Sequence, residues 1–100
     1  MEVKFEQNAS EVIAYLIGRL DTPSALEIAN DVESLKASAS GTIILDCEQL
    51  SYISSSGLRI FLTLRKEAAA KGGRIIVRHI CPEIRNVFMM TGFLNLFEIQ

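Results

Sequence analysis

The residues best suited to chemistry are three consecutive serines, Ser54, Ser55 and Ser56, which stand where an amphipathic helix is expected to begin. One side-chain oxygen is enough to cap the free backbone N–H groups of a first helical turn, so surplus hydroxyls are left over. A helix N-terminus also favours an anionic group, such as a phosphorylated serine, by about 0.3 to 1 kcal/mol. The pattern therefore allows two interpretations, a plain helix cap or an acceptor for phosphate.

The helix after these serines is predicted by the spacing of its apolar residues. They recur every three or four positions and form one face: Leu58, Phe61, Leu64 and Ala68. The pair Gly72-Gly73 is typical of the end of such a helix. We therefore expect a helix from about Gly57 to Lys71, with the serines at its N-terminus.

The segment before the serines supplies a buried strand. Thr42–Asp46 is a short, uninterrupted apolar run that ends at an acid, a pattern typical of a strand covered on both faces. A second such strand follows at Arg74–Val77. We expect Thr42–Asp46 to lie at the centre of the sheet.

Alternating apolar residues near the N-terminus predict an antiparallel hairpin, with strands around Val3–Phe5 and Val12–Gly18. A helix from about Pro23 to Ala37 follows, with Asp21 or Thr22 as its N-cap. Its apolar residues are expected to form one buried stripe: Ala25, Leu26, Ile28, Ala29, Val32 and Leu35. Nothing on this stripe suggests a ligand.

The C-terminal part predicts a helix from Pro82 to Met90, then a short edge strand or docking tail at Leu96–Ile99. Strands joined through helices run parallel, so the elements indicate an α/β fold with a mixed sheet: an antiparallel pair first and parallel strands after it. We expect one domain over residues 1–100, with about four to five strands and three to four helices packed on them as layers. Asp21 and the serines would then share the edge formed by the carboxyl ends of the parallel strands.

The composition describes a small globular protein, with 49% apolar residues, 22% charged residues and a net charge of −2. Because Lys and Arg are not clustered, nucleic acid is not expected as a partner. The longest apolar runs are far too short to cross a bilayer of about 30 Å, and the N-terminus lacks a signal-peptide pattern, so we expect a soluble cytoplasmic protein with no membrane partner. Cys47 and Cys81 lack zinc-ligand spacing and are expected as reduced, partly buried thiols.

Four segments, in this order and spacing, resemble the STAS domain of bacterial anti-sigma factor antagonists over nearly the whole chain. They are Gly18–Asp21, Ile43–Asp46 with Leu50, Ile53–Leu58, and Val87–Phe97. In that family the sequence before the helix usually reads Asp-Ser-Ser/Thr-Gly-Leu, and a partner kinase phosphorylates its first serine. That serine corresponds to Ser55, with Ser56 as the second choice. The usual Asp position is occupied here by Ser54. If that acid serves to cap the helix, a serine oxygen can replace it; if it contacts the kinase or its magnesium, phosphorylation here would be slower or absent.

The resemblance implies a partner-switching cycle. The unmodified domain would bind an anti-sigma factor that is also a serine kinase, so that a sigma factor is released, and phosphorylation of Ser55 would end this interaction. A serine phosphatase would reset the cycle. The sequence also leaves open whether the chain forms a weak homodimer. The chain offers no Gly-rich phosphate loop and no carboxylate constellation for a metal, so we expect neither enzymatic activity nor a cofactor or metal, and the nucleotide belongs to the partner.

Residues around the acceptor are candidates for partner contact. They are Asp21, Ser54, Ser56, Gly57, Arg59, Ile60, Leu62 and Lys66. Those on the helix are equally expected as ordinary solvent-facing or core positions.

Two other functions remain open from the sequence. The Ser54 departure leaves open a STAS scaffold subunit of a transporter or signalling complex that is not phosphorylated. A hydrolase would use a serine nucleophile with His79 as its base, but no GxSxG elbow is present. A single histidine at the end of a strand is more often structural.

Overall fold

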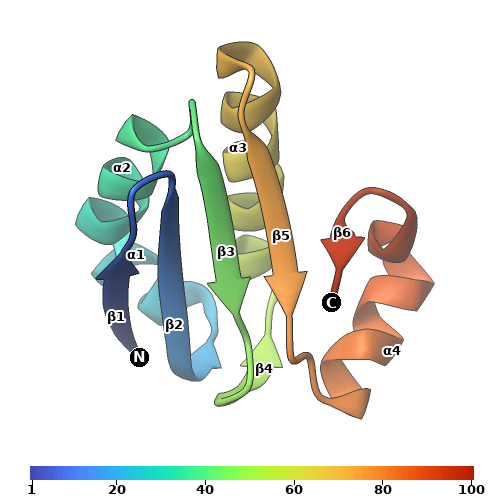
Figure 1. The fold of residues 1–100 in the computed structure, drawn as a ribbon. Helices are drawn as coiled ribbons and strands as arrows, with labels where there is room; N and C mark the ends of the chain where they lie inside the picture. Colours follow the sequence, from blue (N-terminus) through green and yellow to red (C-terminus); the bar gives the residue numbers. More distant parts are fainter.

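The computed structural model describes residues 1–100, and its alternating N-terminal sequence folds as the expected hairpin. Strand β1 (Glu2–Gln7) pairs antiparallel with the long strand β2 (Glu11–Leu20). The other strands are β3 (Thr42–Asp46), β4 (Leu50–Ile53), β5 (Arg74–Arg78) and β6 (Glu98–Ile99). Each of them pairs in parallel, and the order is β1-β2-β3-β5-β6, with β4 on the end of β2. Figure 1 shows β3 in the middle of the sheet, as its apolar sequence predicts.

The sheet has 6 strands, so the expectation of four to five was too low. The missed strand is β4, whose four residues are too few to show an apolar period. It forms because β2 extends beyond β3: the first half of β2 pairs with β3, and Gly18, Arg19 and Leu20 pair with β4. Strand β4 in turn leads directly to the serines at the start of the next helix.

The predicted helix from Pro23 to Ala37 is two helices, α1 (Thr22–Glu27) and α2 (Ala29–Ala37). Ile28 separates them, with φ −96° and ψ 14°, outside the helical range. The single buried stripe was therefore wrong at Leu26, which is 77% exposed, while Ile28 is buried. Ala29 is also exposed.

The two later helices agree with the sequence. Helix α3 (Ser55–Lys71) begins two residues before the expected Gly57 and ends at Gly72, which has φ 74°. Helix α4 (Pro82–Thr91) is followed by a short 3₁₀ turn, η1 (Phe93–Asn95). Only Glu98–Ile99 of the C-terminal tail forms a strand, at the edge beside β5.

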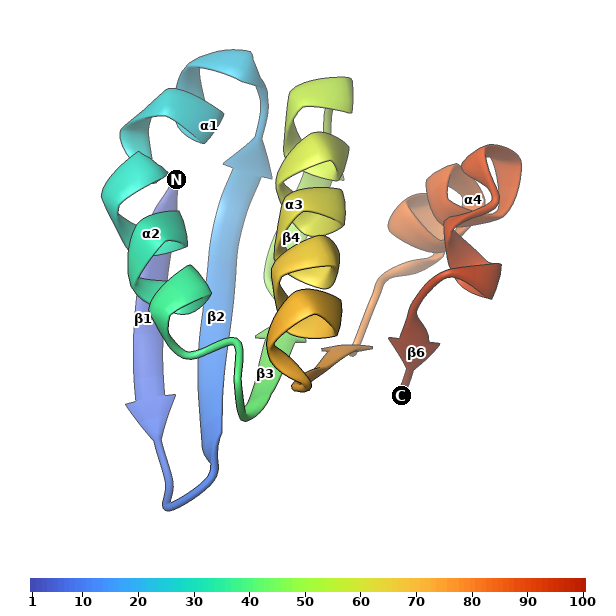
Figure 2. The same ribbon diagram turned by 90° about the horizontal axis from the view of Figure 1, so that it is seen from above.

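Helices α1, α2 and α3 cover one face of the sheet, and α4 lies beside its β5–β6 edge (Figure 2). Between these layers lies a core of 23 buried residues. Four phenylalanines close its α4 side, with ring centroids 5.6 to 6.2 Å apart: Phe61, Phe88, Phe93 and Phe97. A small hydrophobic cluster lies on the other face of the sheet, where Ile13, Ile44 and Ile76 stand in register on β2, β3 and β5.

Both cysteines have free thiols, with Cys47 buried and Cys81 half-buried. Burial raises the pKa of the Cys47 thiol to about 12, so this thiol stays protonated and unreactive. None of the helices combines the length and the apolar character that a membrane crossing requires.

Candidate functional site

Ser54 joins β4 to α3, and Ser55 and Ser56 are the first two residues of α3; we call these three residues the serine turn (Ser54–Ser56). Ser54 is the N-cap of α3: its backbone is extended, and its Oγ accepts a hydrogen bond from the N–H of Gly57 at 3.2 Å. The N–H of Ser54 donates to the carbonyl of Leu20 at 2.8 Å. Ser54 thus caps α3, and it ties the turn to the end of β2.

The other two serines are in different environments. The hydroxyl of Ser56 lies 3.2 Å from that of Thr22, the first residue of α1, and either oxygen can be the donor. Ser55 is the first residue of α3, it is exposed, and its hydroxyl makes no hydrogen bond within the chain. The surplus hydroxyl inferred from the sequence is therefore that of Ser55.

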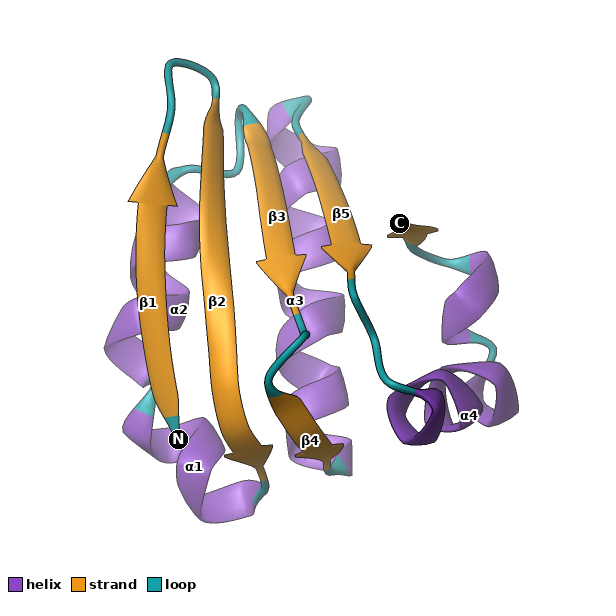
Figure 3. Ribbon diagram, turned by 60° about the horizontal axis from the view of Figure 1, so that its bottom comes forward, coloured by secondary structure: helices purple, strands orange, loops and turns teal.

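Asp21 lies next to the serine turn, as the sequence predicts. It is the N-cap of α1, and its Oδ1 accepts a hydrogen bond from the N–H of Ser24 at 3.0 Å. Hydrogen bonding from Ser24 lowers the pKa of this carboxyl. Figure 3 shows why the two N-termini meet: β2 and β4, which lead into α1 and α3, end at the same edge of the sheet.

Gly57 sets how closely α3 approaches the sheet. It is buried, and a Cβ at this position would lie 2.7 Å from Cγ of Leu20 and 2.8 Å from Cγ1 of Ile53. Real Cβ atoms essentially never approach other atoms this closely. Gly57 therefore lies behind the surface that the other candidate residues form.

The remaining candidates on α3 fall on two faces. Ser55, Arg59, Leu62 and Lys66 are spaced by four, three and four residues, which places them on one face of the helix. Arg59 and Lys66 are exposed and Leu62 is half-buried, so this face is basic with an apolar centre. Ile60 lies on the neighbouring face, packed against the core.

A groove runs along that neighbouring face, between α3 and the α1–α2 pair. Its volume is about 230 Å³, and Ser56, Arg59 and Ile60 line its α3 side. Across it lies Glu33, which is paired with Lys36 at 3.0 Å. The groove therefore begins at the serine turn and has a small apolar floor between charged rims.

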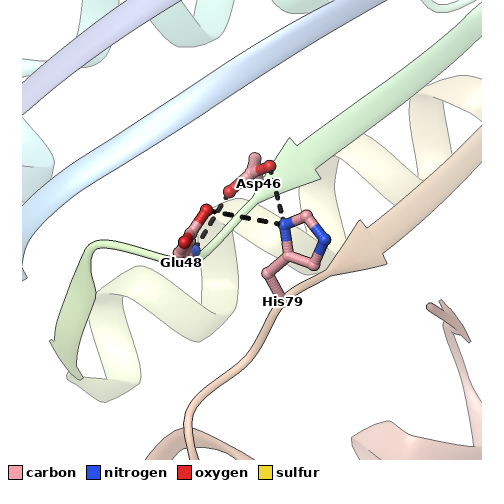
Figure 4. Close-up of side chains that lie close together, drawn as sticks. All are labelled: Asp46, Glu48 and His79. Carbon is pink, nitrogen blue, oxygen red and sulfur yellow. Dashed lines mark hydrogen bonds and ion pairs between the residues drawn. The ribbon is translucent and has the colours of Figure 1, made fainter.

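A second cluster of titratable side chains lies at the ends of β3 and β5 (Figure 4). Nδ1 of His79 is 3.1 Å from Oδ2 of Asp46 and 3.9 Å from Oε2 of Glu48. Asp46 also accepts from Nε of Arg78 at 2.8 Å and from the N–H of Glu48 at 3.0 Å. Burial alone would raise the pKa of the Asp46 carboxyl, but these hydrogen bonds outweigh burial and lower it.

This second cluster is an ion-pair network that joins β3 to β5. Asp46, Glu48 and His79 could each offer a metal one ligand atom, and these atoms lie within 4.8 Å of one another. However, both oxygens of Asp46 are already bonded, and Arg78 neutralises its charge. His79 bonds to the acids and to no serine, so the nucleophile–base pair that a serine hydrolase needs is not formed.

The structure also supplies one contact that the sequence analysis missed, the pairing of Thr22 with Ser56. Thr22 was considered only as an alternative helix cap. Recognising β4 as a strand beside the end of β2 would have brought the two N-termini, and hence these hydroxyls, together.

Comparison with known proteins identifies the family of this chain. The model of the STAS domain family matches residues 1–100. The chain belongs to the STAS domain family. This STAS domain is 27% identical over 99 residues to BtrV of Bordetella bronchiseptica, named as a candidate anti-sigma factor antagonist, and the match covers 99% of this chain and 85% of BtrV.

Two solved structures of the anti-sigma factor antagonist SpoIIAA have the same fold as this STAS domain. The unphosphorylated form gives a TM-score of 0.75 at 26% identity, covering 99% of this chain and 87% of that one. The phosphorylated form of the Bacillus SpoIIAA gives a TM-score of 0.74 at 27% identity, covering 99% and 91%.

Proposed function

We propose that this STAS domain is an anti-sigma factor antagonist that works by partner switching, with Ser55 as its phosphate acceptor. One observation carries the choice of residue. Ser54 is used as the helix cap and Ser56 is bonded to Thr22, whereas Ser55 is exposed and its hydroxyl is free.

The relatives support this proposal. BtrV is named for the same activity, and SpoIIAA is known in both an unphosphorylated and a phosphorylated form. SpoIIAA therefore carries a phosphate on the same fold. By analogy, we propose that phosphorylation here changes the surface of the domain and leaves its architecture intact.

In the proposed reaction this chain is the substrate and the partner is the kinase. The γ-phosphoryl group of ATP is transferred to Oγ of Ser55, ADP leaves, and a base of the partner takes the hydroxyl proton. A phosphate at the first residue of α3 is favoured by the helix dipole. We place the exchange in the cytoplasm, and a serine phosphatase would return the domain to its unmodified form.

The partner surface would be the edge around Ser55. Arg59, Leu62 and Lys66 offer a basic face with an apolar centre, and Asp21 lies beside it. Phosphorylation adds about −1.5 to −2 charges at this edge. If the free energy of binding falls by about 3 kcal/mol, the affinity falls more than a hundredfold, so a local charge change is sufficient to release the partner.

The test is the intact mass of the protein after incubation with ATP and the kinase-type anti-sigma factor encoded nearest to it. We expect one added phosphate on the wild type and on Ser56→Ala, and none on Ser55→Ala. Equal phosphate on Ser55→Ala would reject Ser55 as the acceptor. An unmodified wild type that still captures a transporter ATPase, and no anti-sigma factor, would favour the scaffold function instead.

A further inference from the structure

Arg59 lies on α3 four residues after Ser55, on the same exposed face. Its guanidinium takes part in none of the ion pairs of the chain and donates no hydrogen bond to another residue. The acid that lines the opposite side of the groove, Glu33, is already paired with Lys36. Arg59 is therefore an unpaired charge placed one helical turn from the acceptor.

Helix geometry puts these two side chains within reach of each other. Residues four apart are separated by about 6 Å along the helix axis, and helical side chains lean towards the N-terminus, so the Arg59 side chain can reach the turn that holds Ser55. An acidic group that precedes a basic one by four residues is the favourable order. The planar guanidinium also matches the oxygens of a phosphate with two parallel hydrogen bonds.

We infer that Arg59 is the intramolecular receiver of the Ser55 phosphate, an inference that rests on the proposed modification of Ser55. In the unmodified chain, Arg59 is free to contact an acidic group of the partner. After phosphorylation, the same guanidinium pairs with the phosphate on its own helix. The modification would therefore add a negative charge to the interface and withdraw a positive one from it.

The experiment does not depend on any kinase, because phosphoserine is incorporated at position 55 during translation. The second pKa of the phosphate, about 6 in a free phosphoserine, is measured by ³¹P NMR titration at low salt. We compare the otherwise wild-type phosphoprotein with Arg59→Gln, and use Lys66→Gln as the control. Lys66 shares the face of Arg59 but lies about 16 Å along the axis from Ser55, beyond direct reach.

Pairing with Arg59 should make the phosphate pKa about 0.3 lower than in the Arg59→Gln protein. The Lys66→Gln protein should match the wild type, and the difference should shrink in 1 M NaCl, where the screening length is about 3 Å. Equal pKa values for wild type and Arg59→Gln would overturn the inference, as would an equal effect of Lys66→Gln. If the phosphate pKa shifts as expected but the kinase adds no phosphate to Ser55, the proposed acceptor site is rejected and the pairing with Arg59 is not.

Discussion

The close packing of Gly57 against Leu20 and Ile53 gives a prediction for the substitution Gly57→Ala. Two effects of this change oppose each other. Replacing glycine by alanine inside a helix stabilises it by about 0.8 to 1 kcal/mol, because the unfolded chain loses less freedom. Against this, the new Cβ would lie 2.7 Å from Cγ of Leu20 and 2.8 Å from Cγ1 of Ile53.

The steric effect is expected to be larger. Leu20 is 1% exposed and Ile53 is 4% exposed, and the contacted atoms are carbons close to the backbone of each side chain. Neither can move aside without displacing the end of β2 or β4. Overpacking of this kind costs about 1 to 3 kcal/mol, so Gly57→Ala should lower the free energy of unfolding by about 1 kcal/mol in net.

Urea denaturation followed by far-UV circular dichroism measures this difference. The double variant Leu20→Ala/Gly57→Ala supplies the mechanistic check, because the cavity left at Leu20 makes room for the new methyl group. Its destabilisation should be clearly smaller than the sum of the two single variants. A Gly57→Ala protein that is more stable than the wild type by about 1 kcal/mol, with additive effects in the double variant, would refute the reasoning.

Three further experiments test the cap, the ion-pair network and the core. Ser54→Ala should lower the free energy of unfolding by about 1 kcal/mol, and Ser54→Asp should keep it near the wild-type value in urea titrations, since only the latter retains a cap. Asp46 has a folded pKa below its unfolded value of about 3.9, so its stabilisation is present above that pH and is lost as the pH falls. In Arg78→Met the burial of Asp46 is no longer offset by the guanidinium, so the midpoint of acid unfolding should move to higher pH; an unchanged midpoint would contradict this. Phe88→Ala should cost about 3 to 5 kcal/mol in urea, whereas Met89→Ala, at a 61% exposed position, should stay within about 0.5 kcal/mol.

The sequence predicted those elements in which a long or regular pattern repeats. The apolar face of α3 spans most of its 17 residues, and the alternation in β1 and β2 covers both strands of the hairpin. The glycine at position 72 was identified as a helix end, where the structure has a left-handed φ of 74°. In each case local preference and tertiary packing favour the same conformation.

The missed features depend on contacts between distant segments. Strand β4 exists because it completes the pairing of β2, and nothing within Leu50–Ile53 reveals that partner. The break at Ile28 likewise has no Gly or Pro beside it to signal it, and Leu26 lies in solvent. His79 adopts φ 60°, and no local pattern signals its bond to Asp46, 33 residues away.

For the candidate site, the sequence identified the three serines but could not separate their roles. That separation comes from Leu20 and Thr22, which hold the turn through a backbone bond to Ser54 and a hydroxyl contact to Ser56. The ranking of Ser55 before Ser56 rested on a family resemblance, and the phosphorylation experiment is its test.

The residues that build the serine turn are not the residue proposed to carry the signal. Ser54 and Gly57 fix the backbone, and Ser55 contributes only an outward hydroxyl. A single codon change at position 55 can therefore abolish the input, mimic it with a permanent charge, or exchange the acceptor for threonine, while the scaffold folds as before. Regulation and folding can evolve independently in such a domain, so relatives with the same fold need not respond to the same signal.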